Sequence, residues 1–285
     1  MKLPRLMRKA GGQQDWREMA GKTPPEGADP QANHPPDLAG RRAFLAKHIL
    51  IHTHVPKTAG STLAHALAAM VGGTQAMDLR LRRALRPRDM TDEDKRELRM
   101  ISGHFVYGMH ERFPQRPLYL AAVRDPVERA VSYYRFVKGA KDHPNHAEFH
   151  DLSFEESWDR MTGRAALTRS NEQSAILSGL QPGDTPDEDL LWQRAKEDYF
   201  LIIPQGQVDE AIRRLRAAYG LPWTKVPQMN RSHGDAPEPG ADIRIRIEAE
   251  NALDLTLVDW AGRNFEERLD RAVAYIAHHC LKDGG

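Results

Sequence analysis

The sequence predicts an α/β fold of three layers, in which helices cover both faces of a central parallel sheet. Two observations predict it. Short β-branched and aliphatic runs recur along the chain, and apolar runs of this length are typical of strands that are buried on both faces. Segments with apolar residues at helical spacing lie between these runs. Strands that alternate with helices in this way favour parallel pairing.

The first strand is expected at residues 48–55, where β-branched and aliphatic residues end at a proline. Further strands are expected at 99–102, 117–123 and 199–203. Helical spacing of apolar residues predicts helices at 60–71, 127–137, 153–163, 165–179, 207–219 and 248–279. Residues 91–94 (TDED) resemble a capping signature and predict one more helix after them. No internal repeat is visible.

The chain of 285 residues is expected to divide into a tail and one domain. Residues 1–40 are rich in Gly, Pro, Gln and charge and show no apolar period. Such a segment buries too little surface to offset its ordering entropy, so a flexible tail is expected there. Residues 41–285 are expected to form a single domain with one sizeable core.

The composition excludes several function classes. The chain has 41 basic and 40 acidic side chains, a net charge of +1, so nucleic acid is not expected as a partner. The single cysteine, Cys280, allows no intramolecular disulfide, and no Cys/His cluster has zinc-site spacing. No signal peptide or transmembrane segment is visible, so we expect a cytoplasmic protein. The alternative left open is peripheral membrane contact through the basic first ten residues.

A loop at residues 54–62 (HVPKTAGST) joins the first predicted strand to the helix after it. Such a loop leaves backbone N–H groups at the positive end of the helix dipole, which favours a bound anion. The small Ala and Gly allow close approach of the backbone, and the lysine adds a mobile cation. The loop predicts a P-loop-type fold with an anion site formed by Lys57, Thr58, Ala59, Gly60, Ser61 and Thr62. The alternative is a turn whose hydroxyls only cap the helix.

A second motif, residues 124–134, follows the strand at 117–123 and opens a helix. An arginine at a strand end can bind a phosphate through paired hydrogen bonds. Ser132 lies about two helical turns after Arg124 and reaches the same anion if the helix passes beside it. The alternative is an ordinary helix start, with Asp125 as its cap and the arginine at position 129 in a surface ion pair.

Between these motifs, the segment 102–108 (SGHFVYG) contains the candidate catalytic base. Histidine has a suitable pKa for removing the proton of a hydroxyl group. His104 follows a short predicted strand and a glycine, so its ring could project from a strand end into a cleft. His52, His54 and His110 are nearby competitors for this role.

The segment HVPKTAGSTL resembles the 5′-phosphosulfate-binding loop of sulfotransferases that use 3′-phosphoadenosine 5′-phosphosulfate (PAPS). The resemblance is closest to the carbohydrate branch, which contains the heparan sulfate 2-O-sulfotransferases. The motif at 124–134 resembles the family's 3′-phosphate motif, and Gly-His with a following aromatic resembles its acceptor-site segment. The resemblance spans roughly residues 48–270 and is looser in its second half, at 171–173, 177–179, 230–232 and 254–268.

The resemblance implies a role for each motif. The loop holds the 5′-phosphate and Lys57 acts on the oxygen that bridges phosphorus and sulfur, while Arg124 and Ser132 bind the 3′-phosphate. His104 is the implied catalytic base. PAPS is then the co-substrate, 3′,5′-adenosine bisphosphate the product, and a hydroxyl group, preferably of a carbohydrate, the acceptor. No metal is expected, because a sulfuryl group has less negative charge than a phosphoryl group. The polar segment 138–161 is a candidate wall of the acceptor site, with a surface loop as the alternative.

Two other functions compete with this one. The first is a P-loop kinase or NTPase, whose loop reads GxxxxGK[ST]; here the lysine precedes the glycine and the first glycine is absent. The second is a nucleotide-binding protein that has kept the fold and lost the chemistry. The acceptor itself and the oligomeric state have no sequence signature.

Overall fold

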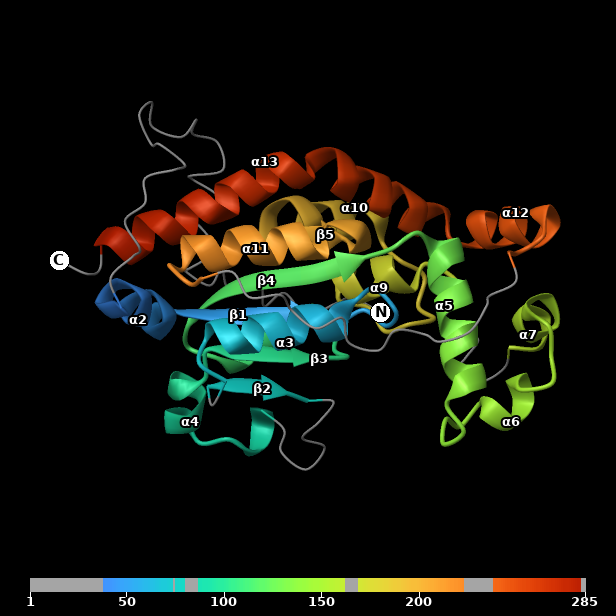
Figure 1. The fold of residues 1–285 in the computed structure, drawn as a ribbon, viewed down its shortest axis with the longest axis horizontal. Coiled ribbons are helices and arrows are strands. Elements are labelled where there is room, and N and C mark those ends of the chain that lie inside the picture. The colour runs from blue at the N-terminus through green and yellow to red at the C-terminus, as the bar shows by residue number, and fades with distance from the viewer. Residues whose placement is uncertain (1–37, 74, 80–86, 162–168, 223–237, 283–285) are drawn as a thin grey trace, which may run out of the picture.

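Five parallel strands form one sheet at the centre of the described residues (Figure 1). The computed structural model describes residues 38–73, 75–79, 87–161, 169–222 and 238–282. The strands are β1 (His48–Thr53), β2 (Ala76–Asp78), β3 (Met100–Gly103), β4 (Arg116–Val123) and β5 (Tyr199–Pro204). Their order is β2-β3-β1-β4-β5, so that β1 lies between β3 and β4.

The helices fill the segments between and after the strands. They are α2 (Leu38–Lys47), α3 (Gly60–Met70), α4 (Asp92–Glu97), α5 (Pro126–Gly139), α6 (His146–Phe149), α7 (Phe154–Arg160), α9 (Glu172–Ser178), α10 (Glu188–Gln193), α11 (Val208–Ala218), α12 (Ala241–Glu250) and α13 (Ala252–Lys282). Short 3₁₀ turns are η1 (Pro87–Asp89), η2 (Met109–Arg112) and η4 (Gln205–Gln207), and η3 (Arg194–Asp198) is a π-helical turn.

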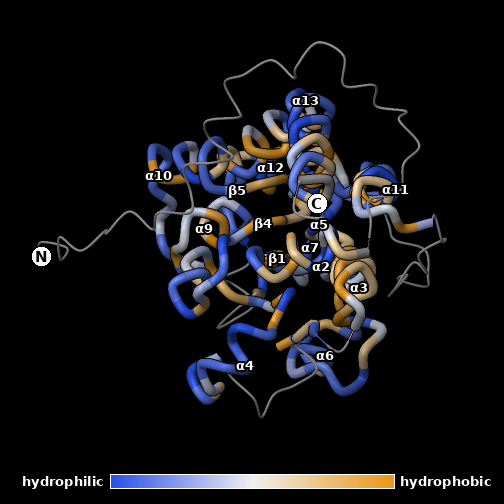
Figure 2. The backbone as a smooth tube through the Cα atoms, turned by 90° about the vertical axis from the view of Figure 1, so that its left-hand side faces the viewer, coloured by the Kyte–Doolittle hydropathy of each residue, from blue (hydrophilic) through white to orange (hydrophobic). Residues whose placement is uncertain are grey.

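The two faces of the sheet support separate apolar cores, because successive strand side chains point to opposite sides. Leu50 and Leu120 belong to one core, together with residues of α3, α11 and the second half of α13. Ile51 and Tyr119 belong to the other, together with residues of α9, α10 and the first half of α13. In Figure 2 α3 is largely apolar, whereas α4, which buries no residue, is hydrophilic. Helices on both faces confirm the predicted three-layer α/β/α fold.

A third apolar cluster lies beyond the carboxyl ends of the strands, where α5 stands across the sheet (Figure 1). It joins α5, α6, α7 and α12 through Tyr134, Phe149, Trp158 and Ile247, among others. This small core fixes α5 from its outer side. The position of α5 matters because its first turns contain Ser132 of the second predicted motif.

The long helix predicted at 248–279 is confirmed as α13, which begins four residues later, whereas α12 before it was not predicted. Asn251, between them, is buried. Its side chain donates a hydrogen bond to the carbonyl oxygen of Arg169 (2.6 Å) and accepts one from the N–H of Asn171 (2.9 Å). The Asn171 side chain in turn accepts the N–H of Asp254 (3.0 Å), near the start of α13. These hydrogen bonds separate α12 from α13. They join residues far apart in the chain, so the spacing of apolar residues along the sequence does not reveal them.

The other predicted strands and helices are confirmed with small shifts at their ends. The predicted cap before α4 is also confirmed: the N–H of Asp94 donates to the Thr91 hydroxyl (3.1 Å), and its carboxylate accepts the Thr91 N–H (3.0 Å). α2 begins at Leu38, inside the segment predicted as a tail; residues 1–37 lie outside the described residues. Of the helix predicted at 165–179, the described part is α9. β2, α6 and α10 were not predicted, because elements this short show no period.

Candidate functional site

The predicted phosphate loop leaves the carboxyl end of β1, the central strand, and leads into α3. Two of its residues, Lys57 (φ 68°) and Ala59 (φ 65°), have left-handed backbone conformations. Such a conformation costs a non-glycine residue about 1–3 kcal/mol and is concentrated at functional sites. The carbonyl oxygen of Ala59, the N-cap of α3, accepts the N–H of Thr62 at 3.0 Å. The loop is therefore a strained turn at a helix N-terminus, a backbone form suited to anions.

Close packing under the loop restricts which side chains fit at two of its positions, 58 and 60. The Thr58 hydroxyl is buried and donates to the carbonyl oxygen of Val55 (2.9 Å), so this side chain holds the loop together. A Cβ atom on Gly60 would lie 2.1 Å from Cδ2 of His54, so a larger residue does not fit. Ser61 is half-buried at the start of α3. Contacts of Thr58 and Gly60 with an anion would therefore come from their backbone.

Lys57 is half-buried, and its Nζ atom lies 4.2 Å from the centre of the Phe136 ring on α5. Burial, and then the nearby positive charge of Arg124, lower the pKa of Lys57 to about 8. Most Lys57 side chains are thus still charged at pH 7. The two cations repel each other in a partly buried site, and a bound anion would offset this repulsion.

Arg124 follows the last residue of β4, the neighbour of β1. Its Nη1 atom lies 3.4 Å from the carbonyl oxygen of Lys57, and its Nε donates to the Glu128 carboxylate (3.2 Å). Its backbone is held from both sides by the buried Gln173 of α9. The Arg124 N–H donates to Gln173 Oε1 (2.9 Å), and Gln173 Nε2 donates to the Arg124 carbonyl oxygen (2.8 Å). The guanidinium group is therefore positioned beside the loop.

Ser132 lies in the second turn of α5 and is half-buried. Phe136 is four residues further on, so both side chains are on the same face of the helix. Phe136 contacts the Lys57 amine, which shows that this face is turned toward the loop. Asp125 caps α5 by accepting the Glu128 N–H (3.0 Å), as the alternative interpretation of this motif expected. The cap and a site at Ser132 are compatible.

His104 follows the end of β3, on the other side of β1. Its side chain is exposed, and its Nδ1 atom lies 2.8 Å from the carbonyl oxygen of His54. A carbonyl oxygen only accepts hydrogen bonds, so Nδ1 carries the proton of the neutral ring. Nε2 then has the lone pair of that tautomer, which a general base requires.

The three competing histidines are in less suitable positions. His52 is fully buried and its Nδ1 lies 2.8 Å from the Ser102 hydroxyl. His54 is 5% exposed, and its ring packs against Gly60. His110 is half-buried, with its Nδ1 2.9 Å from the Tyr119 hydroxyl, and burial first of all lowers its pKa. Of these four histidines, His104 alone presents an exposed ring beside the loop.

The order β3-β1-β4 thus brings the three predicted features together at one edge of the sheet. The loop lies in the middle, His104 on one side and Arg124 on the other. The alternative interpretation of the second motif, with Arg129 in a surface ion pair, does not agree with the structure. Arg129 forms a buried ion pair with Glu172 of α9, both side chains 4% exposed, and burial raises the pKa of Glu172 despite this partner.

Two side chains near the site had no signal of their own in the sequence. Gln173 was noted only within a loosely similar segment, and its contact with Arg124 connects residues far apart in the chain. Phe136 is 41% exposed, and an isolated aromatic residue on a helix gives no indication of a lysine beside it. Both depend on how α5 and α9 pack against the strand ends.

The predicted acceptor wall, 138–161, contains the end of α5, α6 and α7. It is therefore mainly helical, and not a simple surface loop. The His143 ring lies 5.4 Å from the Phe136 ring. The pKa of His143 is lowered by partial burial, then by His146 and by Lys57. The part of the segment around His143 therefore lies near the phosphate loop.

Among the described residues, no group of three or more His, Cys, Asp or Glu side chains is placed to hold a metal ion. In the same part of the chain, no helix has the length and apolar character needed to span a membrane. The segment 230–232, which belongs to the looser half of the resemblance, lies outside the described residues.

Comparison with known proteins gives a family match. Residues 43–179 match the family model described as Sulfotransferase family. The matched region includes the loop, His104, Arg124 and Ser132, and ends with α9. It supports a sulfotransferase family for this chain and does not distinguish the carbohydrate branch. No curated protein matches the sequence significantly.

Proposed function

We propose that the protein transfers a sulfuryl group from PAPS to a hydroxyl group of an acceptor, with a carbohydrate as the favoured class. The observation that carries the proposal is the arrangement of three neighbouring strand ends. A strained loop with Lys57 lies between a second cation, Arg124, and an exposed histidine, His104. The family match over residues 43–179 supports sulfuryl transfer in general.

The charges fit the donor. PAPS has a phosphosulfate at the 5′ position and a phosphate at the 3′ position, so its site needs cations in two places. Lys57 and the first amides of α3 are suited to the first group, and Arg124 with Ser132 to the second. Burial first, and then the nearby charge of Arg124, lower the pKa of Lys57 to about 8. A bound anion would raise this pKa again and hold the lysine in its charged form.

In the proposed reaction, the acceptor oxygen forms a bond to sulfur while the bond from sulfur to the phosphate oxygen breaks. The proton of the acceptor hydroxyl moves to Nε2 of His104. The electron pair of the broken bond stays on the phosphate oxygen, where Lys57 stabilises the new charge. Removing one donor of this kind typically costs about 2.7–4 kcal/mol of barrier.

The acceptor would approach from the side of His104, with residues 138–161 as one wall. His143 supports this assignment, because its ring lies beside Phe136. It is also close enough to Lys57 for the lysine charge to contribute to the lowered pKa of His143, after burial and His146. A polar, histidine-containing wall suits a ligand with many hydroxyl groups. Replacing His143 by alanine should raise KM for the acceptor and leave the affinity for the donor product unchanged.

The test is incubation with isotope-labelled PAPS and a panel of sugars, phenols and lipids, with mass spectrometry to detect an added sulfuryl group. Transfer that continues in EDTA and is lost in Lys57→Ala supports the proposal. Normal transfer by Lys57→Ala refutes the assigned role of the loop. Magnesium-dependent ATP hydrolysis would favour the kinase or NTPase alternative. Binding of 3′,5′-adenosine bisphosphate without transfer to any acceptor would favour a protein that has lost the chemistry.

A further inference from the structure

The exposed ring of Phe136 lies beside the lysine of the predicted phosphate loop. Phe136 is 41% exposed, whereas Tyr134 and Val137, close to it on α5, are buried. A single exposed apolar side chain needs no explanation by itself. The centre of this ring, however, lies 4.2 Å from the Nζ atom of Lys57. The ring therefore belongs to the immediate surroundings of the lysine.

The contact has the geometry of a cation–π interaction. A cation within about 6 Å of the centre of an aromatic ring is attracted by the negative face of the ring. This attraction increases where water is partly excluded, and Lys57 is half-buried. The ring of Phe136 is thus placed to stabilise the charged end of the lysine side chain.

Two other influences on Lys57 act against its charge. Burial, and then the positive charge of Arg124, lower the pKa of Lys57 to about 8. The face of an aromatic ring acts in the opposite direction, because it attracts the ammonium form and not the neutral amine. A carboxylate would have the same effect on the lysine, but its negative charge would repel an anion in the loop. An aromatic ring has no net charge, so it stabilises the charged lysine without repelling the anion.

The ring of Phe136 is itself held by a neighbouring ring. The His143 ring lies 5.4 Å from it at an angle of 81°, which is the edge-to-face arrangement of aromatic pairs. The N–H of His143 donates to the carbonyl oxygen of Ala140 (2.8 Å), and its Nδ1 accepts the N–H of Asn145 (3.2 Å). Both bonds lie within the segment between α5 and α6. The Phe136 ring is therefore fixed between its own helix and this segment.

We propose that Phe136 is a positioning residue for Lys57, whose charged amine it holds beside the donor site. The inference deepens the proposed function: its consequence for transfer rests on that function, whereas the contact between ring and amine does not. Phe136 takes no part in the reaction and acts through Lys57. A full negative charge attracts a cation more strongly than a ring face does, so a bound donor draws the amine from the ring to the bridging oxygen.

The first measurement is the pKa of Lys57 in the full chain, without a donor or acceptor. Lysine labelled with ¹³C at Cε is followed by NMR as the pH is raised, and Lys57→Arg identifies the signal by its loss. Phe136→Leu keeps an apolar side chain beside the amine and removes the ring face. The pKa of Lys57 should then fall by about 0.4–1.5, which corresponds to the usual strength of a cation–π contact.

The direction of this change separates the ring face from simple burial. Water admitted by the smaller leucine would raise the pKa of Lys57, because burial is the main cause that lowers it. A fall therefore identifies the loss of the ring face as its cause. Phe136→Tyr keeps the ring face, so it should keep the pKa of Lys57 as well.

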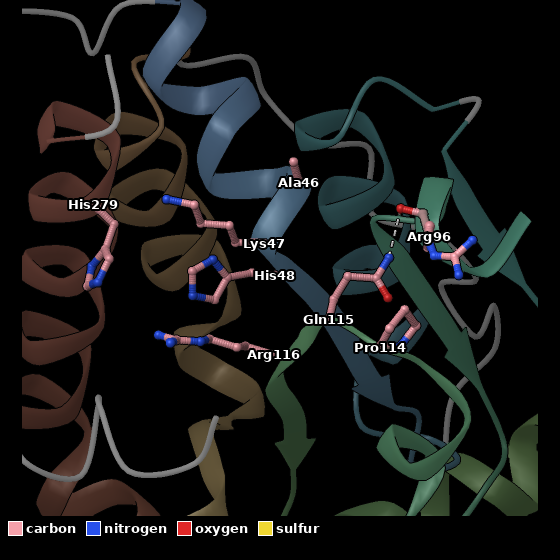
Figure 3. Close-up of a pocket in the computed structure, with 8 residues that line it drawn as sticks. All are labelled: Ala46, Lys47, His48, Arg96, Pro114, Gln115, Arg116 and His279. Carbon is pink, nitrogen blue, oxygen red and sulfur yellow. Dashed lines mark hydrogen bonds between the residues drawn. The ribbon is translucent and has the colours of Figure 1, made fainter. Parts of the chain in front are cut away.

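Two controls show whether the effect is local. Tyr133→Leu removes another aromatic ring of α5, which also contacts His143 (6.1 Å between ring centres), and should leave the Lys57 signal unchanged. Lys47 provides an internal reference, because it lines a pocket at the start of β1 (Figure 3), whereas the loop follows the other end of this strand. β1 has six residues and spans about 20 Å. The Lys47 signal should therefore be the same in every variant.

The second measurement is the pH profile of kcat/KM for the donor, which reports groups of the free enzyme. In Phe136→Leu its alkaline limb should move to lower pH by the same amount, and it should return in Phe136→Tyr. An unchanged or raised pKa of Lys57 in Phe136→Leu overturns the inference, as does an equal fall in Tyr133→Leu. A fall without a change in the pH profile overturns the positioning role. If no acceptor is sulfated, the proposed function fails, and the NMR titration alone decides on Phe136.

Discussion

Replacing Gln173 by alanine should weaken the binding of a 3′-phosphate, although Gln173 is buried behind the site. Its side chain holds both backbone groups of Arg124, at 2.9 and 2.8 Å. Without it, the N–H and the carbonyl oxygen of Arg124 lose their partners, and the strand end is free to move. The guanidinium group would then no longer be fixed beside the loop.

The magnitude follows from the bonds that are lost. Each buried backbone group left without a partner costs about 1–3 kcal/mol, so unfolding should become easier by at least about 2 kcal/mol. A charge-assisted hydrogen bond from arginine to phosphate contributes about 1.5–3 kcal/mol, which corresponds to roughly ten- to a hundredfold in affinity. We expect the loss of affinity to lie at the lower end of this range, because Arg124 keeps its charge.

The assay compares two ligands, 3′,5′-adenosine bisphosphate and adenosine 5′-monophosphate, by isothermal titration. Gln173→Ala should reduce the preference for the bisphosphate and change the affinity for the monophosphate little. The matched control is Ser174→Ala, the next residue of α9, whose hydroxyl donates to the buried Asp254 (2.6 Å) and not to Arg124. It should lose stability but keep the preference. A loss of this preference in both variants, or in neither, would refute the proposed role of Gln173 in positioning Arg124.

Three further predictions concern the loop and the base. Affinity for 3′,5′-adenosine bisphosphate should fall as the pH rises above about 8, because Lys57 has a pKa of about 8 and loses its proton there. Titrations in buffers of different ionisation enthalpy should show proton uptake on binding. Gly60→Ala should destabilise the fold by about 1–3 kcal/mol and weaken binding, since the added Cβ would lie 2.1 Å from the His54 ring. Urea unfolding measures the loss. His104→Ala should lower kcat by roughly 10²–10⁴-fold and leave the affinity for the bisphosphate unchanged.

Each of these predictions has a control. Lys57→Arg stays charged over the same range, so its binding should not depend on pH; a profile like that of the native protein would contradict the role of Lys57. Adding His54→Ala to Gly60→Ala should restore part of the lost stability, and no such recovery would exclude the predicted clash. His110→Ala should keep most of kcat; if it instead lowers kcat as much as His104→Ala does, His104 is not the base.

The strands and the loop were predictable because their signals are local. A buried parallel strand is a short continuous apolar run, and the loop after β1 combines small residues, hydroxyls and a lysine within nine positions. The helix break at Asn251 was missed, since it depends on hydrogen bonds to Arg169 and Asn171. The burial of Arg129 was missed for the same reason: its partner, Glu172, comes from a helix distant in sequence.

The sequence by itself determined the fold class, the position of the loop after β1 and the choice of the candidate residues Lys57, His104 and Arg124. These features depend on residue type and on neighbours along the chain. The tertiary structure alone decided how the candidates are held: the tautomer of His104 by the carbonyl oxygen of His54, the backbone of Arg124 by Gln173, and the pKa of Lys57 by burial and by Arg124. Each of these depends on distances between segments far apart in the chain, which packing of the helices against the sheet defines.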